Sequence, residues 1–130
     1  MRHLNLQANE ITKIENLVSL PNLNHLDLSF NKIVEINPFI TEGNSLQHLR
    51  VLILNRNLIT EIKNIDSFQH LNLLDLQENK IKEISGIEKL ASLRILNLSA
   101  NLIEGPVNFA MGTFKQLVEI NLKRNKITSV

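Results

Sequence analysis

Residues 71–84 read LNLLDLQENKIKEI and residues 23–36 read LNHLDLSFNKIVEI, so that ten of the fourteen positions are identical. The underlying unit, Leu-x-x-Leu-x-Leu-x-x-Asn-x-Ile or a close equivalent, occurs six times in the 130 residues of the chain. A unit repeated in register every roughly 20 to 50 residues is typical of a solenoid, in which each coil packs against the next. The asparagines of the unit are Asn9, Asn31, Asn57, Asn79, Asn101 and Asn125, with spacings of 22, 26, 22, 22 and 24 residues.

Each part of the unit has a structural interpretation. The Leu-x-Leu alternation predicts a short strand with one buried face. The asparagine stands where the chain turns away from the strand, and its amide can satisfy backbone groups of its own turn and of the neighbouring coil. We therefore predict that the six asparagines form a ladder along the stacked coils. In the return segments apolar residues recur at every third position, as in Ile59, Ile62, Ile65 and Phe68, which favours 3₁₀ or loose helical turns over an α-helix.

This pattern resembles the leucine-rich repeat family over essentially the whole chain. The 22-residue unit with its Ile-x-x-Ile-x-x-Leu return is similar to the short intracellular subclass. That subclass includes a regulatory subunit of protein phosphatase 1, the leucine-rich light chain of outer-arm dynein and a spliceosomal ribonucleoprotein subunit. The resemblance implies an α/β solenoid of about six repeats, a horseshoe with a parallel sheet on its concave face and a 3₁₀, irregular or short helical convex side. Residues 1–130 then form a single leucine-rich repeat domain.

Two repeats and both ends of the chain depart from the pattern. Residues 37–49, NPFITEGNSLQHL, include four extra residues, and residues 104–114, EGPVNFAMGTF, include two. We interpret both as length variation, with a contact loop as the alternative, and we expect Val107, Phe109 and Phe114 to be buried. Neither end has the polar capping repeat that a solenoid needs. This indicates a fragment of a longer repeat protein, or an array that self-associates through its uncapped ends.

The composition argues against several classes of function. The 14 basic and 13 acidic residues nearly cancel, so no strong field attracts nucleic acid or a membrane surface. No apolar run approaches the ~18 residues of a membrane span, and the opening stretch, MRHLNLQANE, lacks the apolar centre of a signal peptide. The absence of cysteine favours a reducing, intracellular compartment. We expect the cytoplasm, the cytoskeleton or a cilium, with the nucleus as an alternative.

The sequence contains no recognisable catalytic arrangement. It has no cysteine, no G-x-S-x-G, no glycine-rich phosphate loop and no H-E-x-x-H, so we expect neither an enzyme nor a cofactor. His3 and His25 occupy equivalent positions, as do His48 and His70, which predicts two pairs about 5 Å apart. No third ligand occurs at a fixed offset, so we expect polar surface residues and no metal site. Glu35, Glu61 and Glu83 recur among lysines and are interpreted as a solvated convex surface.

A candidate partner site lies on the expected concave face. Most outward positions of the strands are polar, but Val51, Leu73 and Ile95 fall on consecutive strands with Ile53 beside them. An apolar centre with a polar rim is typical of a protein-binding surface, although β-branched residues also favour strands for their own sake. The predicted partner-binding residues are His25, Asp27, Phe30, Val51, Ile53, Arg56, Leu73, Asp75, Ile95 and Asn97.

These observations favour a non-catalytic module that binds a protein partner on its concave face, as a scaffold or regulatory subunit. One alternative is a module associated with a ribonucleoprotein. Direct nucleic-acid binding is not expected, because the predicted concave face has basic residues only at one end, Lys123 and Arg124, with Arg56 nearby. Another alternative is a repeat segment of a larger protein whose activity lies elsewhere. The identity of Asp27 and Asp75 in the two near-copies is attributed to common descent of the repeats, since both are expected to face solvent.

Overall fold

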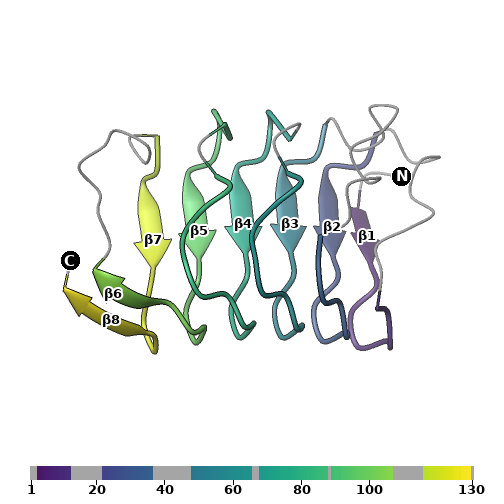
Figure 1. Cartoon of the computed structure of the whole chain (residues 1–130). Coiled ribbons are helices and arrows are strands. Elements are labelled where there is room, and N and C mark those ends of the chain that lie inside the picture. Colours follow the sequence, from purple (N-terminus) through teal and green to yellow (C-terminus); the bar gives the residue numbers. More distant parts are fainter. Residues whose placement is uncertain are drawn as a thin grey trace.

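The structure is a computed structural model that describes residues 3–12, 22–36, 48–65, 68–87, 89–106 and 116–129. Its main element is a parallel sheet of six three-residue strands, one from each repeat, in the order β1-β2-β3-β4-β5-β7 (Figure 1). The predicted parallel sheet is confirmed. The strands are β1 (His3–Asn5), β2 (His25–Asp27), β3 (Val51–Ile53), β4 (Leu73–Asp75), β5 (Ile95–Asn97) and β7 (Glu119–Asn121).

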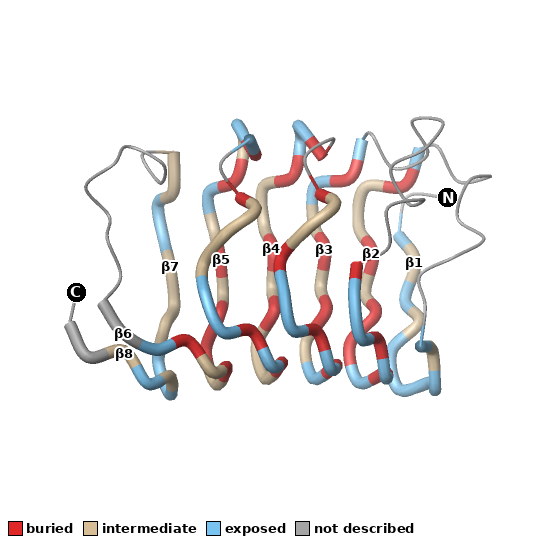
Figure 2. Tube along the Cα trace, in the orientation of Figure 1, coloured by how far each residue is buried: buried red, intermediate tan, exposed pale blue. Residues whose placement is uncertain are grey.

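The leucine pattern explains both the register and the core. The central residue of each strand pairs with its counterpart in the next strand, for example Leu26 with Leu52 and Leu74 with Leu96. These four leucines are at most 1% exposed, and each such burial stabilises the fold by about 1.5–3 kcal/mol. Ile33, Ile59, Ile81 and their neighbours on the return segments close the core from the other side. Figure 2 shows the buried residues in the coils of β2 to β5.

The return segments are irregular, and the described residues include no helix. Single turns account for the apolar spacing of three. The Phe68 amide donates to the Ile65 carbonyl at 3.0 Å, and the Leu71 amide donates to the Phe68 carbonyl at 3.1 Å. Because these i-to-i+3 bonds are isolated, each brings one apolar side chain back to the core without starting a 3₁₀ helix. The irregular convex side is therefore the one of the expected alternatives that the described residues adopt.

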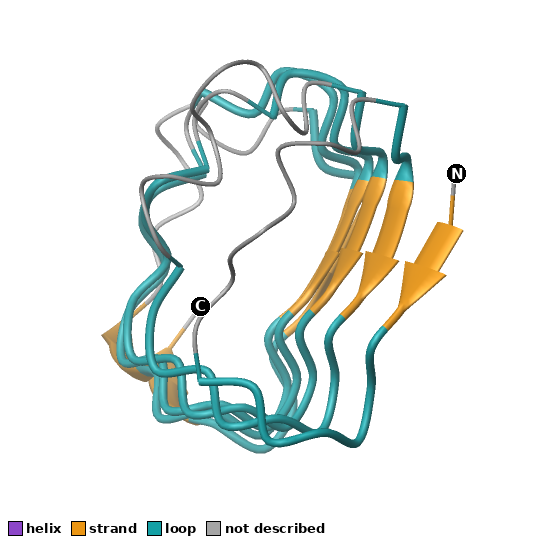
Figure 3. Ribbon diagram, turned by 90° about the vertical axis from the view of Figure 1, so that its right-hand side faces the viewer, coloured by secondary structure: helices purple, strands orange, loops and turns teal. Residues whose placement is uncertain are grey.

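A second, two-stranded parallel sheet lies at the C-terminal end of the solenoid. It pairs β6 (Glu104–Pro106) with β8 (Lys126–Ser129), with a register shift between Gly105 and Pro106. Figure 3 shows this pair on the side of the coil opposite the main sheet. The sequence pattern did not predict it. The expected burial of Val107, Phe109 and Phe114, and the insertion within residues 37–47, lie outside the described residues.

The turn after each strand uses a left-handed backbone at one position. The residue before every ladder asparagine has a φ between 54° and 59°. None of these residues is glycine, so each carries roughly 1–2 kcal/mol of strain. The conformation turns the amide toward the following coil, as in the 2.8 Å bond from the Phe30 amide to the Asn55 carbonyl. The six residues are Ala8, Phe30, Arg56, Glu78, Ala100 and Arg124.

Candidate partner-binding face

The sheet register brings the predicted aliphatic residues together. Val51 pairs with Leu73, and Leu73 pairs with Ile95, on three adjacent strands. Ile53 belongs to the same face, two residues after Val51 on β3. All four side chains are half-buried, whereas the leucines between them are fully buried. We call these four residues the apolar patch.

The third residue of each strand also faces outward, and it has a structural function that the sequence pattern did not reveal. Asp27 Oδ1 accepts hydrogen bonds from the Ser29 amide (3.0 Å) and the Ser29 hydroxyl (2.7 Å). Asp75 Oδ1 accepts one from the Gln77 amide at 3.1 Å. An Asn or Asp that bonds its own backbone two residues on forms an Asx-turn. The attribution of Asp27 and Asp75 to common descent alone was therefore wrong, because each side chain holds the end of its strand.

Position 53 is the exception in this row. The same bond occurs on three other strands. There the backbone amide two residues on donates, at 3.0 Å in each case, to Oδ1 of Asn5, Asn97 or Asn121. Ile53 pairs in register with Asp27 on one side and Asp75 on the other. Its aliphatic side chain has no oxygen to accept this bond, so an apolar surface replaces a structural hydrogen bond at the centre of the face.

Two acidic residues, Asp27 and Asp75, flank Ile53. Burial raises the pKa of Asp75, and the negative charge of Asp27 adds to this effect. Hydrogen bonds from the Gln77 backbone and the Asn55 side chain oppose it. In the amide orientation that satisfies both side chains, the Asn55 nitrogen donates to Asp75 Oδ1 at 2.5 Å and Oδ2 at 3.1 Å. Ile53 of the apolar patch thus has an acidic residue on each side, and one of them, Asp75, is partly buried.

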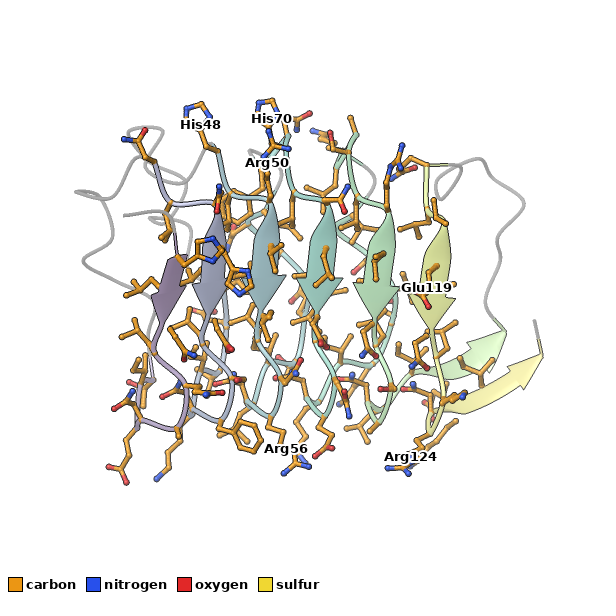
Figure 4. The ribbon with its side chains drawn as sticks, turned by 180° about the vertical axis from the view of Figure 1, so that it is seen from behind. His48, Arg50, Arg56, His70, Glu119 and Arg124 are labelled. Atoms are coloured by element: carbon orange, nitrogen blue, oxygen red, sulfur yellow. The ribbon has the colours of Figure 1, made fainter. Side chains whose placement is uncertain are left out.

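Phe30 and Arg56 lie in the row of left-handed residues at the edge of the sheet where the strands end. The Arg56 guanidinium carbon stands 4.8 Å from the centroid of the Phe30 ring, a cation–π contact. Arg56 Nε also pairs with Glu78 Oε2 at 2.9 Å. Figure 4 shows Arg56 at this edge. The two predicted residues therefore contact each other, and Glu78, which was not predicted, fixes the guanidinium. Phe30 remains 47% exposed.

The remaining predicted rim residues lie at the two sides of the apolar patch. His25 is the residue of β2 that pairs with Val51, and its ring stacks on that of His3 with centroids 5.0 Å apart. Asn97 is the residue of β5 that pairs with Asp75. His48 and His70 also stack, at 6.2 Å. Among the described residues no group of three or more His, Cys, Asp or Glu side chains is arranged to hold a metal ion.

The ladder asparagines connect successive coils. Asn57 Nδ2 donates to carbonyls of its own turn, Leu54 (3.1 Å) and Asn55 (3.2 Å), and to Leu28 of the preceding coil (3.0 Å). Its Oδ1 accepts the Ile33 amide of that coil at 3.0 Å. Both amide atoms therefore have partners in a buried position, where an unpaired polar atom is costly. The same set of bonds occurs at Asn31, Asn79, Asn101 and Asn125. Within the described part of the chain, Asn9 bonds only its own turn.

Comparisons with known proteins agree with this architecture. The family profile described as "Leucine Rich repeats (2 copies)" matches residues 1–41, and the profile described as "Leucine rich repeat" matches residues 47–103. No curated protein matches the chain.

In the part of the chain that the structure describes, no helix is both long and apolar enough to cross a membrane.

Three solved structures illustrate the similarity. An internalin (inlF) from Listeria monocytogenes str. 4b F2365 is 29% identical with a TM-score of 0.77, over 94% of this chain and 35% of its own. A structure of a TLR13–ssRNA13 complex is 30% identical with a TM-score of 0.87, over 98% of this chain and 19% of that one. The ectodomain of the receptor kinase SOBIR1 from Arabidopsis thaliana is 26% identical with a TM-score of 0.69, over 97% and 71%.

The chain thus spans about a third of the internalin and a fifth of the TLR13 chain. Both profiles describe a leucine-rich repeat, and the six-stranded sheet and the asparagine ladder are built from that repeat. The chain belongs to the leucine-rich repeat family.

Proposed function

We propose that this chain is a non-catalytic module that binds a protein partner on its concave face, over the apolar patch. One observation carries the proposal: Val51, Leu73 and Ile95 lie side by side in the sheet register. Ile53 strengthens it, because an aliphatic residue there replaces the Asx-turn acceptor found at the same position of the other five strands. At Ile53 the fold lacks a stabilising hydrogen bond and gains exposed apolar surface, which is expected at a binding site.

The surroundings of the patch have the chemistry of a protein interface. Interfaces combine an apolar centre with a polar rim, and aromatic and arginine side chains contribute strongly to binding. Phe30 and Arg56 supply both residue types in a fixed contact at the edge of the face. A stable interface buries about 800 Å² on each partner. The partner therefore covers the rim as well as the patch, including Asp27, Asp75 and Asn97.

The cellular role is proposed from the resemblance and the composition. The similarity to the short intracellular subclass and the absence of cysteine support a scaffold or regulatory subunit inside the cell. The chain is a single repeat domain in this proposal. Because it spans only part of the solved relatives, we also propose that it serves as the partner-binding segment of a longer protein.

A second candidate function is association with RNA, which the single-stranded RNA in the TLR13 complex brings forward. The concave face of this chain gives it little support. Among the described residues, the outward positions of the six strands and the positions two residues beyond them contain one lysine or arginine, Lys123. The chain also has neither Trp nor Tyr for base stacking. Protein binding therefore remains the function that the geometry supports best.

Site-specific photo-crosslinking tests the proposed face. A photoreactive phenylalanine analogue is placed at position 73 in one protein and at position 34 in a control, since Val34 is an exposed apolar residue on the return segment. After irradiation in an extract of the source organism, adducts are identified by mass spectrometry. We expect a discrete protein adduct from position 73 that is absent from position 34. The same adducts from both positions, or an RNA adduct at position 73, would contradict the proposal.

A further inference from the structure

A separate hollow lies at the edge of the main sheet where the strands begin. It has a volume of about 480 Å³. Figure 4 shows Arg50 and His70 at this edge, opposite the edge that holds Arg56 and Arg124. We call the hollow the basic groove. Its lining residues are Arg50, His70, Asn72, Ala91, Ser92, Arg94 and Gln116.

The repeat places the charged residues of the groove in order. Arg50, Asn72 and Arg94 each stand immediately before a strand, β3, β4 and β5 respectively. Backbone hydrogen bonds connect them, from the Asn72 amide to the Arg50 carbonyl (2.8 Å) and from the Arg94 amide to the Asn72 carbonyl (2.9 Å). Since neighbouring strands lie about 4.8 Å apart, the two arginine backbones are roughly 10 Å apart. Two arginine side chains at that distance can both reach one small group held between them.

No carboxylate among the described residues of the lining neutralises the charges in the groove. These residues supply two guanidinium groups, an imidazole, two side-chain amides and one hydroxyl group. Within the described residues Arg50 and Arg94 make no ion pair, whereas Arg56 pairs with Glu78 at 2.9 Å and Lys63 pairs with Glu35 at 3.1 Å. In a chain with a net charge of only +1, two unpaired guanidiniums at one hollow form a local site for an anion.

We propose that the basic groove binds the phosphoryl group of a phosphorylated serine or threonine in a peptide segment. A phosphoryl group carries nearly two negative charges and three acceptor oxygens, which match two guanidinium forks and the neighbouring donors. A single carboxylate satisfies only one such fork. RNA fits less well, because among the described residues that line the groove only His70 has a ring that could stack on a base. The inference does not depend on the proposed function, since no groove residue belongs to the apolar patch.

An NMR titration of the ¹⁵N-labelled protein tests this proposal. The probe is a short glycine peptide with a central phosphoserine, and the same peptide with serine is the reference. We expect the phosphopeptide to shift the amide signals of Arg50, Asn72 and Arg94, and the reference peptide to leave them unchanged. Arg94→Gln should weaken binding about tenfold. Arg124→Gln removes the same charge at the opposite edge and should change the affinity less than about twofold.

Three outcomes would overturn the proposal. Equal weakening by Arg94→Gln and Arg124→Gln would mean that only net charge matters. Inorganic phosphate that binds as tightly as the phosphopeptide would make the groove a site for free anions and not for a peptide. A short single-stranded RNA that binds more tightly at the same amides would assign it to nucleic acid. Because Arg94 is exposed, its variant should keep the wild-type spectrum elsewhere, and Arg50→Gln provides an independent second test.

Discussion

At the scale of the residue, two kinds of polar side chain hold the coils in place. The ladder asparagines connect each coil to the one before it, and the Asx-turn residues hold the ends of the strands. The ladder could be predicted, because an invariant Asn at a turn beside buried leucines needs backbone partners. The Asx-turns could not be predicted from the sequence. Asp27 and Asp75 alternate with leucine in the same way as outward strand residues that have no structural function.

Removing one internal ladder amide should be costly. Asn57→Ala loses four hydrogen bonds and leaves buried backbone groups of two coils without a partner, including the Ile33 amide. We expect a loss of about 3–5 kcal/mol in the free energy of unfolding, measured by urea denaturation. Asn9→Ala is the matched control, because exposed Asn9 bonds only its own turn and should lose less than about 1 kcal/mol. Equal losses would refute a ladder between coils.

The raised pKa of Asp75 gives the protein a defined pH dependence. The folded state binds the Asp75 proton more readily than the unfolded chain, so the stability that this group contributes is fully present below its ordinary pKa of 3.8. That contribution is lost as pH rises through the folded-state pKa. Asp75→Asn keeps an acceptor for the Gln77 amide, as Asn97 does for Ser99, and removes the charge.

We therefore expect Asp75→Asn to be more stable than the wild type at neutral pH, with an advantage that shrinks toward acid pH. Thermal unfolding of both proteins between about pH 3 and pH 7 measures this difference. A wild type that is the more stable protein at neutral pH would show that the Asp75 carboxylate is favourably stabilised in the fold, contrary to its raised pKa.

At the scale of the element, the strands were predictable and the return segments only in part. Leu-x-Leu before each asparagine marks one strand per repeat. An apolar spacing of three fits 3₁₀ turns and isolated turns equally well, and the structure contains the latter in its described residues. The β6–β8 pair was missed because Glu104–Pro106 has neither alternation nor a strand-forming composition. Its pairing comes from the stacking of coils and not from local preference.

Gly86 shows how closely the return segments approach one another. Its φ is +74°, and a Cβ atom there would lie 2.2 Å from the Ile62 carbonyl oxygen of the preceding coil. Gly86→Ala should lower the free energy of unfolding by more than about 2 kcal/mol. The equivalent residue one coil earlier is Asn64, with φ 62° and a 2.7 Å bond from Nδ2 to the Ile36 carbonyl. Asn64→Gly loses only that bond and should cost about 1 kcal/mol by the same measurement. A Gly86→Ala protein as stable as the wild type would disprove this close contact.

At the scale of the whole molecule, a constant offset made the concave face predictable. Every strand of the main sheet begins six residues before its ladder asparagine, as Val51 does before Asn57, and the length differences fall in the return segments. Reading equivalent positions across the repeats therefore gives true spatial neighbours. The same offset applied one position earlier places Arg50 and Arg94 in one row, immediately before the strands.

In our proposal, the apolar patch is the binding surface for a protein partner. Leu73→Glu tests it most directly, and the fold should tolerate the change, since Glu119 occupies the equivalent position of β7. Val34→Glu is the matched control, with the same change of chemistry at an exposed apolar residue outside the concave face. The measurement is quantitative affinity purification from an extract of the source organism, with the two variants compared to the wild type. We predict that Leu73→Glu loses at least about 90% of the captured partner, because a buried unpaired charge costs several kcal/mol at an interface. Val34→Glu should retain the partner. A folded Leu73→Glu protein that captures as much partner as the wild type would show that the partner binds elsewhere.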